Sequence, residues 1–169
     1  ADTGEISGPM LNKLGVQYTI VGQSERRWKL GESDEVVNKK LKAVLRNDMT
    51  PIVCLGERVW DENFKEFLKE QTEKTFAGLS HDEMGKCLIA YEPVWAISTN
   101  PSARPDTPES AIESIGVIRE IVGDVKVLYG GSVNSSNASE FLKQEEIDGV
   151  LVGRASVNKE EFLKILSQV

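Results

Sequence analysis

A glutamate directly follows one of the most apolar runs in the sequence. Stretch 90–95 (AYEPVW) places Glu92 at the end of a segment with the composition of a buried strand. A carboxylate that is partly desolvated in such a place can have a raised pKa and act as a general base. A carboxylate that only caps a turn or pairs with a nearby arginine has the same sequence context. Spacing alone therefore leaves both interpretations of Glu92 open.

Two glycine-containing turns, 130–132 (GGS) and 153–156 (GRAS), follow the last two apolar runs. Glycine lets backbone N–H groups come close to a ligand, and the start of a helix favours an anion. Two such turns on neighbouring strands predict a phosphate site. Each turn taken singly is equally well explained as a tight connection between a strand and a helix.

Apolar runs and amphipathic stretches alternate along the chain and must position these groups. The runs 16–22, 50–56, 86–91, 125–129 and 149–153 are rich in Val, Ile, Leu and Tyr and show little alternation, which is typical of parallel strands. Helices are predicted at 9–14, 33–47, 61–77, 107–122, 136–143 and 158–167. This order predicts an α/β protein with a parallel sheet, whose polar clusters gather at the carboxyl ends of the strands.

Composition narrows the class of protein. The 169 residues suit one domain spanning 1–169, and the net charge of −7 argues against partners such as nucleic acid or an anionic membrane. No apolar run approaches the about 18 residues of a membrane span. Cys54 and Cys87 lie in apolar runs, which indicates buried thiols in a reducing, cytoplasmic compartment. His81 is the only histidine and no Cys/His cluster has metal-ligand spacing, so no metal is expected.

Several segments together resemble the triosephosphate isomerase family. Stretches 21–27 (VGQSERR), 90–97 (AYEPVWAI), 128–133 (LYGGSV) and 151–156 (LVGRAS) match its motifs in order and spacing. Stretch 3–7 (TGEIS) resembles the third loop of the family, which inserts into the partner subunit of a dimer. The resemblance covers the whole chain. It implies interconversion of dihydroxyacetone phosphate and glyceraldehyde 3-phosphate with no cofactor, and a homo-oligomer.

The resemblance assigns roles to individual positions. Glu92 matches the general base, and Gln23 stands where the family has its electrophilic histidine. Glu25 matches a carboxylate near the family's N-terminal lysine. The first hinge of the family's lid corresponds to Pro93, Val94 and Trp95. The backbone N–H positions that hold the phosphate correspond to Ser98, Ser132, Gly153 and Arg154.

The chain also departs from the family pattern. It shows five βα units where the family has eight, and the missing units carry an asparagine and a lysine of the site. Gln23 can donate a hydrogen bond but cannot shuttle a proton as imidazole does. The lid tip is altered at 98–101 (STNP), and Arg154 replaces a glycine, with a side chain that could either assist an anion or fill the space. We therefore expect an inactive or severely impaired isomerase. The alternatives are a non-catalytic binder of phosphate or a phosphorylated triose, and a structural barrel fragment.

Five strands taken from an eight-stranded barrel cannot close, and one face of such a sheet would be bare. We expect the truncated barrel to open and reorder into a Rossmann- or flavodoxin-like three-layer sandwich, with helices on both faces. The alternative is a partial barrel whose copies associate as a homo-oligomer.

Overall fold

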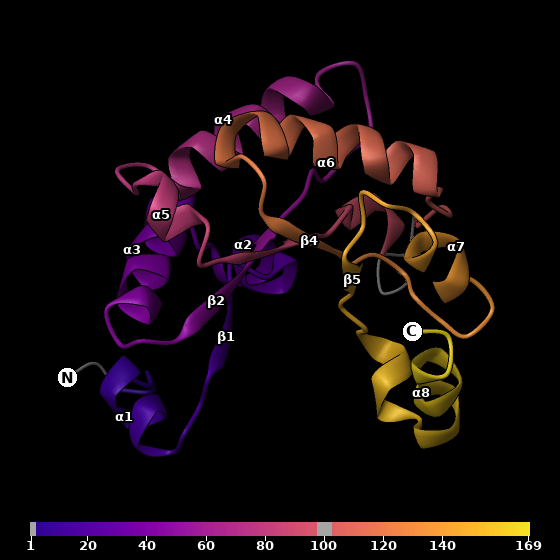
Figure 1. The fold of residues 1–169 in the computed structure, drawn as a ribbon. Coiled ribbons are helices and arrows are strands. Elements are labelled where there is room, and N and C mark those ends of the chain that lie inside the picture. The colour runs from indigo at the N-terminus through magenta and orange to yellow at the C-terminus, as the bar shows by residue number, and fades with distance from the viewer. Residues whose placement is uncertain (1–2, 98–102) are drawn as a thin grey trace.

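Strands and helices alternate through the computed structural model, which describes residues 3–97 and 103–169 (Figure 1). The strands are β1 (Tyr18–Val21), β2 (Thr50–Leu55), β3 (Leu88–Tyr91), β4 (Lys126–Tyr129) and β5 (Gly149–Val150). The α-helices are α1 (Gly8–Lys13), α2 (Ser24–Leu30), α3 (Asp34–Leu45), α4 (Phe64–Thr75), α5 (His81–Met84), α6 (Pro108–Val122), α7 (Ala138–Leu142) and α8 (Lys159–Leu166). Two 3₁₀ helices, η1 (Val94–Ala96) and η2 (Arg154–Val157), follow β3 and β5.

All five strands are parallel and lie in the order β1-β2-β3-β4-β5. The expected five-stranded parallel sheet built from βα units is confirmed, and the sheet is open. The predicted reordering into a flavodoxin-like sandwich is wrong, because that fold places its first strand inside the sheet, between the second and third. Each strand here pairs with the next one in the chain, as in part of a β/α barrel.

The two faces of the sheet differ in burial. Paired residues Val21, Val53, Ile89 and Val127 form a row across four strands and are at most 4% exposed. The helices α3, α4, α5 and α6 follow this outer side of the sheet as an arc (Figure 1). On the inner face Ile20 pairs with Ile52, and Ile20 is 44% exposed. The composition of the strands predicted burial on both faces, whereas the inner face is partly exposed at Ile20.

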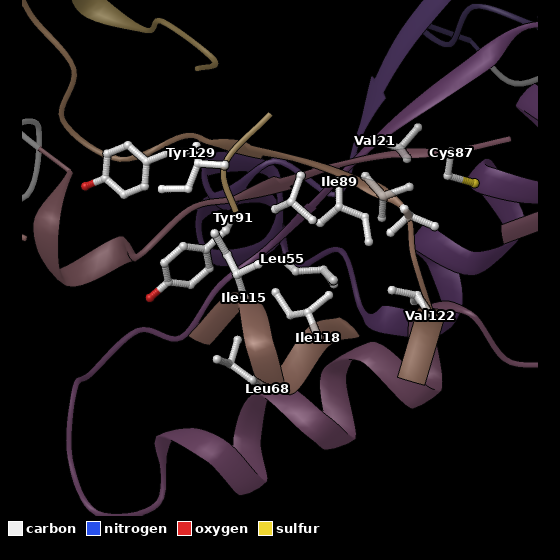
Figure 2. Close-up of a cluster of buried hydrophobic side chains, with 14 of the residues drawn as sticks. Val21, Leu55, Leu68, Cys87, Ile89, Tyr91, Ile115, Ile118, Val122 and Tyr129 are labelled. Carbon is white, nitrogen blue, oxygen red and sulfur yellow. The ribbon is translucent and has the colours of Figure 1, made fainter. Parts of the chain in front are cut away.

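The core lies between the outer face of the sheet and the helices α4 and α6. Leu68 from α4 and Ile115 and Ile118 from α6 are at most 1% exposed and gather beneath Leu55 and Ile89 of the sheet (Figure 2). Burying each such side chain contributes about 1.5–3 kcal/mol. This one-sided core holds the strands together while the carboxyl ends remain accessible.

Local sequence signals set most helix boundaries. Helix α6 begins with Pro108 at its first position, and the Thr107 hydroxyl accepts a hydrogen bond from the Ser110 N–H. Helix α3 begins after Ser33, whose hydroxyl accepts from the Val36 N–H. The sequence did not predict α2 as a helix. Its seven residues (SERRWKL) follow β1 after two residues and carry too few apolar positions for a helical period.

The predicted buried thiols are confirmed, because Cys54 and Cys87 are both free and buried. Within the described part of the chain, none of the helices combines the length and the apolar composition that a membrane crossing requires.

Gly56 marks the closest approach between β2 and the end of β3. A Cβ at this position would lie 1.9 Å from the Glu92 carbonyl oxygen. We expect Gly56→Ala to lower the free energy of unfolding by about 2–3 kcal/mol, because the clash involves backbone that cannot rotate away. Gly116→Ala is the matched control. Position 116 lies in α6 with no atom within 4 Å of the added Cβ, so alanine should stabilise by about 0.5–1 kcal/mol. Urea unfolding of both variants measures the difference, and equal effects would contradict the packing described here.

Candidate active site

A pocket of about 400 Å³ lies at the carboxyl ends of the strands. Residues that follow β1, β3, β4 and β5 line it, although they are far apart in the sequence. Those with predicted roles are Gln23, Glu25, Glu92, Ser132, Gly153 and Arg154. The structure therefore brings most of the predicted residues to one place. Ser98 lies outside the described residues.

Glu92 is almost completely buried at the edge of this pocket. The residue is only 5% exposed, and the Ser24 N–H donates a hydrogen bond of 2.9 Å to Glu92 Oε2. Burial raises the pKa of Glu92, while the bond from Ser24, the Cys54 thiol and the Arg27 charge oppose the rise. A buried carboxylate with a raised pKa and few partners has the properties of a general base.

Gly130 makes room for the Glu92 side chain on the β4 side. A Cβ at Gly130 would lie 2.9 Å from Glu92 Cγ. The glycine that begins the turn after β4 is therefore needed for packing around the carboxylate, in addition to any role in ligand binding.

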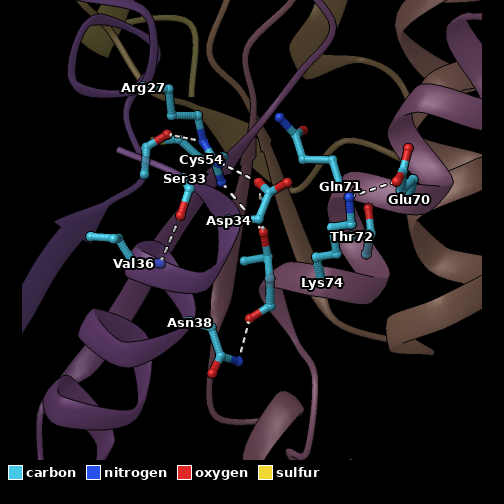
Figure 3. Close-up of polar contacts among 12 residues, drawn as sticks. Arg27, Ser33, Asp34, Val36, Asn38, Cys54, Glu70, Gln71, Thr72 and Lys74 are labelled. Carbon is cyan, nitrogen blue, oxygen red and sulfur yellow. Dashed lines mark hydrogen bonds and ion pairs between the residues drawn. The ribbon is translucent and has the colours of Figure 1, made fainter. Parts of the chain in front are cut away.

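Arg27 holds together the turn that carries Ser24. Its Nε donates to the Gly22 carbonyl at 2.6 Å, and its Nη2 donates to the Cys54 carbonyl at 3.2 Å. Its Nη1 forms an ion pair of 2.5 Å with Asp34 (Figure 3). The guanidinium is fully engaged although the residue is only 8% exposed, so its burial is compensated. Arg27 thereby ties the ends of β1 and β2 to the start of α3.

Gln23 and Glu25 lie on either side of Ser24 and differ in their surroundings. Gln23 is half-buried, precedes the first residue of α2 and lines the pocket. Glu25 also lines the pocket but is exposed, and its carboxylate pairs with Lys29 at 3.3 Å. Gln23 and Ser24 are therefore the neutral polar side chains from the β1 end that line the pocket beside Glu92.

The residues predicted as a hinge pack on a second buried carboxylate. Glu57 is 1% exposed, and its Oε1 accepts hydrogen bonds from Tyr91 Oη at 2.8 Å and Trp95 Nε1 at 2.6 Å. Burial raises the pKa of Glu57. Val94 N–H donates to the Glu57 carbonyl at 3.0 Å, and Pro93 precedes η1. Sequence reasoning assigned no role to Glu57, although its position directly after β2 was the available signal.

Several backbone N–H groups beside the pocket have no acceptor in the described part of the chain. They belong to Gly131, Ser132 and Val133 after β4, and to Gly153 and Arg154 after β5. Val133 is 6% exposed, and buried N–H groups without partners are rare in proteins. Successive N–H groups of this kind form a concavity that binds anions. In residues 3–97 and 103–169, no group of three His, Cys, Asp or Glu side chains is arranged to hold a metal ion.

Consecutive parallel strands with a polar pocket at their carboxyl ends define this protein as one of the β/α-barrel class. The family model described as triosephosphate isomerase matches residues 1–169. The chain belongs to the triosephosphate isomerase family.

Relatives in several bacteria support this assignment. The chain is 43% identical to the triosephosphate isomerase of Acetivibrio thermocellus, over 98% of this chain and 69% of that protein. Identity to the triosephosphate isomerase of Aquifex aeolicus is 46%, over 98% of this chain and 70% of that protein. Identity to the triosephosphate isomerase of Saccharopolyspora erythraea is 44%, over 98% of this chain and 67% of that protein. The resemblance that the motifs indicated is confirmed.

The raised pKa of Glu92 predicts a pH-dependent effect on stability. Below the pKa of the unfolded state the carboxyl is neutral in both states and its burial carries no charge penalty. As pH rises through the raised folded pKa, the unfolded state gains from ionisation and the native state loses relative stability. Glu92→Gln keeps an acceptor for the Ser24 N–H and carries no charge.

We therefore expect Glu92→Gln to match the unmodified protein in urea unfolding at about pH 4 and to exceed its stability at about pH 8. A gain of the same size at both pH values would show that packing, and not charge, causes the difference.

Proposed function

We propose that these 169 residues carry the base and the phosphate-binding part of a triosephosphate isomerase site, and that they turn over dihydroxyacetone phosphate and glyceraldehyde 3-phosphate only poorly. The observation that carries the proposal is the burial of Glu92 beside backbone N–H groups of two loops that have no acceptor among the described residues. The family membership supports the substrate class.

Each group has a defined task in this reaction. The N–H groups after β4 and β5 hold the phosphate of the triose, so that its carbon atoms extend toward Glu92. Glu92 removes a proton from the hydroxyl-bearing carbon next to the carbonyl and delivers it to the former carbonyl carbon. The proton of that hydroxyl group is lost to water, and the former carbonyl oxygen takes a proton from water. The Gln23 amide donates a hydrogen bond to the carbonyl oxygen and stabilises the enediolate that develops.

Turnover is expected to be low for two reasons that lie within the pocket. Gln23 cannot exchange a proton with the substrate oxygens, and loss of such an acid/base group costs about 10²–10⁴ in rate. Among the described residues that line the pocket, Arg154 is the only one with a cationic side chain. The family places a lysine at the developing enediolate, no lysine is among the described residues that line this pocket, and removing one preorganised charge typically costs about 10²–10³.

A homo-oligomer is part of the proposal. Stretch 3–7 (TGEIS) resembles the family segment that inserts into a partner subunit, and Ile6 in it is 66% exposed. The half-exposed inner row at Ile20 offers further apolar surface that a second copy can cover. Sedimentation equilibrium measures the mass, and a monomer at high micromolar concentration would contradict this part of the proposal.

A non-catalytic phosphate binder is the second candidate, and the unpaired N–H groups favour it independently of Glu92. Anion binding by backbone groups requires neither the base nor Gln23. Both the isomerase and the non-catalytic binder would bind phosphate, so a measurement of turnover distinguishes them.

Restoring an imidazole tests the isomerase proposal. We expect Gln23→His to raise kcat/KM for glyceraldehyde 3-phosphate by about 10²-fold or more, because the imidazole can polarise the carbonyl and exchange a proton. Gln17→His is the matched control, since Gln17 is exposed before β1 and does not line the pocket. Turnover by the unmodified chain within tenfold of a complete family member would refute the proposed impairment. No gain in Gln23→His would remove Gln23 from the site.

Phosphate titration tests the binding proposal. In ¹H–¹⁵N spectra, inorganic phosphate at millimolar concentration should shift the amide signals of Ser132, Gly153 and Arg154. Arg154→Gln should weaken binding about tenfold or more, because a charge-assisted hydrogen bond contributes about 1.5–3 kcal/mol. Arg46→Gln makes the same charge change at an exposed site outside the pocket and should have no effect. Absence of any shift would favour a purely structural role for these loops.

A further inference from the structure

Asn137 spans the loop that follows β4. Its Nδ2 donates a hydrogen bond of 2.8 Å to the Ser132 carbonyl, and its Oδ1 accepts one of 2.8 Å from the Asn134 N–H. Asn137 precedes the first residue of α7, where an asparagine usually accepts a bond from the helix. No such bond forms here. Both polar atoms of the side chain are used to hold the loop instead.

The bond to Ser132 fixes the orientation of one peptide unit beside the pocket. In a trans peptide the carbonyl and the following N–H point in opposite directions. Because the Ser132 carbonyl faces Asn137, the Val133 N–H points away from Asn137. Val133 lines the pocket, and its N–H has no acceptor in the described part of the chain. Asn137 thus sets the direction of the Val133 N–H, one of three consecutive N–H groups without an acceptor among the described residues. It also limits rotation of the peptide units next to Val133.

The Tyr129 ring restricts the same loop from the strand side. A Cβ at Gly131 would lie 2.2 Å from Tyr129 Oη, and Tyr129 is 1% exposed. The backbone therefore passes directly over the tyrosine, and Asn137 holds it from the other end. These contacts leave the N–H row little freedom to turn.

Helix α8 and the residues that follow it anchor the second half of the loop independently. The Ser135 N–H donates to Glu161 Oε1 at 2.6 Å, and Gln168 Nε2 donates to the Ser135 carbonyl at 2.8 Å. The Ser136 N–H donates to Asn134 Oδ1 at 2.8 Å. Because these bonds do not involve Asn137, its loss should change the first half of the loop while the rest stays attached to α8.

We propose that Asn137 is a positioning residue for anion binding, which orients the N–H groups of residues 131–133 toward the phosphate. The proposal rests on the phosphate site proposed above. It depends on the amide side chain, because its nitrogen donates to the Ser132 carbonyl while its oxygen accepts from the Asn134 N–H. Aspartate retains the acceptor alone, and alanine retains neither. Preorganised donors bind more tightly because their ordering is complete before the ligand arrives.

Inorganic phosphate provides the test, with Asn137→Ala and Asn137→Asp as variants. Asn38→Ala is the matched control, since Asn38 Nδ2 also donates to backbone carbonyls, those of Thr75 and Ala77, away from the pocket. All titrations are followed by the Val133 and Ser132 amide signals at about 0.5 M sodium chloride. Salt at that concentration screens the added carboxylate of Asn137→Asp, so that a remaining loss reflects the missing donor.

We expect about tenfold weaker phosphate binding in both Asn137 variants, with the Val133 signal no longer responding as it does in the unmodified protein. Asn38→Ala should lose thermal stability but keep the phosphate affinity. If an Asn137 variant binds phosphate as tightly as the control, Asn137 is only a structural residue and the inference fails, while the phosphate site stands. If the unmodified protein gives no phosphate response at all, the site and the inference both fail.

Discussion

The close packing around Glu92 is the constraint on which the site depends. Its carbonyl lies against Gly56 from β2, its side chain lies against Gly130 after β4, and the Ser24 N–H after β1 bonds to its carboxylate. A side chain at either glycine would separate the strand ends. This packing removes Glu92 from water, and the same burial raises its pKa toward that of a useful base.

The polar residues around the pocket divide into groups that line it and groups that hold the lining groups in place. Arg27, Glu57 and Asn137 satisfy backbone or side-chain partners with good geometry. The N–H groups at 131–133, by contrast, have no acceptor in the described residues. Supports held in place by their own hydrogen bonds, around donors without an acceptor among the described residues, are what a preorganised binding site requires. The groups that line the pocket are therefore held in place by Arg27, Glu57 and Asn137, which do not line it themselves.

The main hydrophobic core lies on one side of the sheet. The outer row at Val53 and Ile89 is fully buried under α4 and α6, whereas Ile20 on the inner face is 44% exposed. The helices stay on one side because every crossover joins neighbouring strands in the same sense, and right-handed crossovers of this kind place their helices on one face. Covering the inner face would have required some crossovers to reverse direction along the sheet.

Local composition and short motifs in the sequence predicted the five strands and most of the helices, the parallel sheet, the family, and the places of Glu92, Gln23 and the glycine turns at strand ends. They did not predict α2, whose few apolar positions give no helical period. Strand order was decided only in three dimensions, because apolar runs such as 50–56 pair equally well with either neighbour until the helices pack. The partners of Glu57 and Asn137 could not be predicted either, because Trp95 and Ser132 come into contact with them only through tertiary contacts or a specific turn geometry.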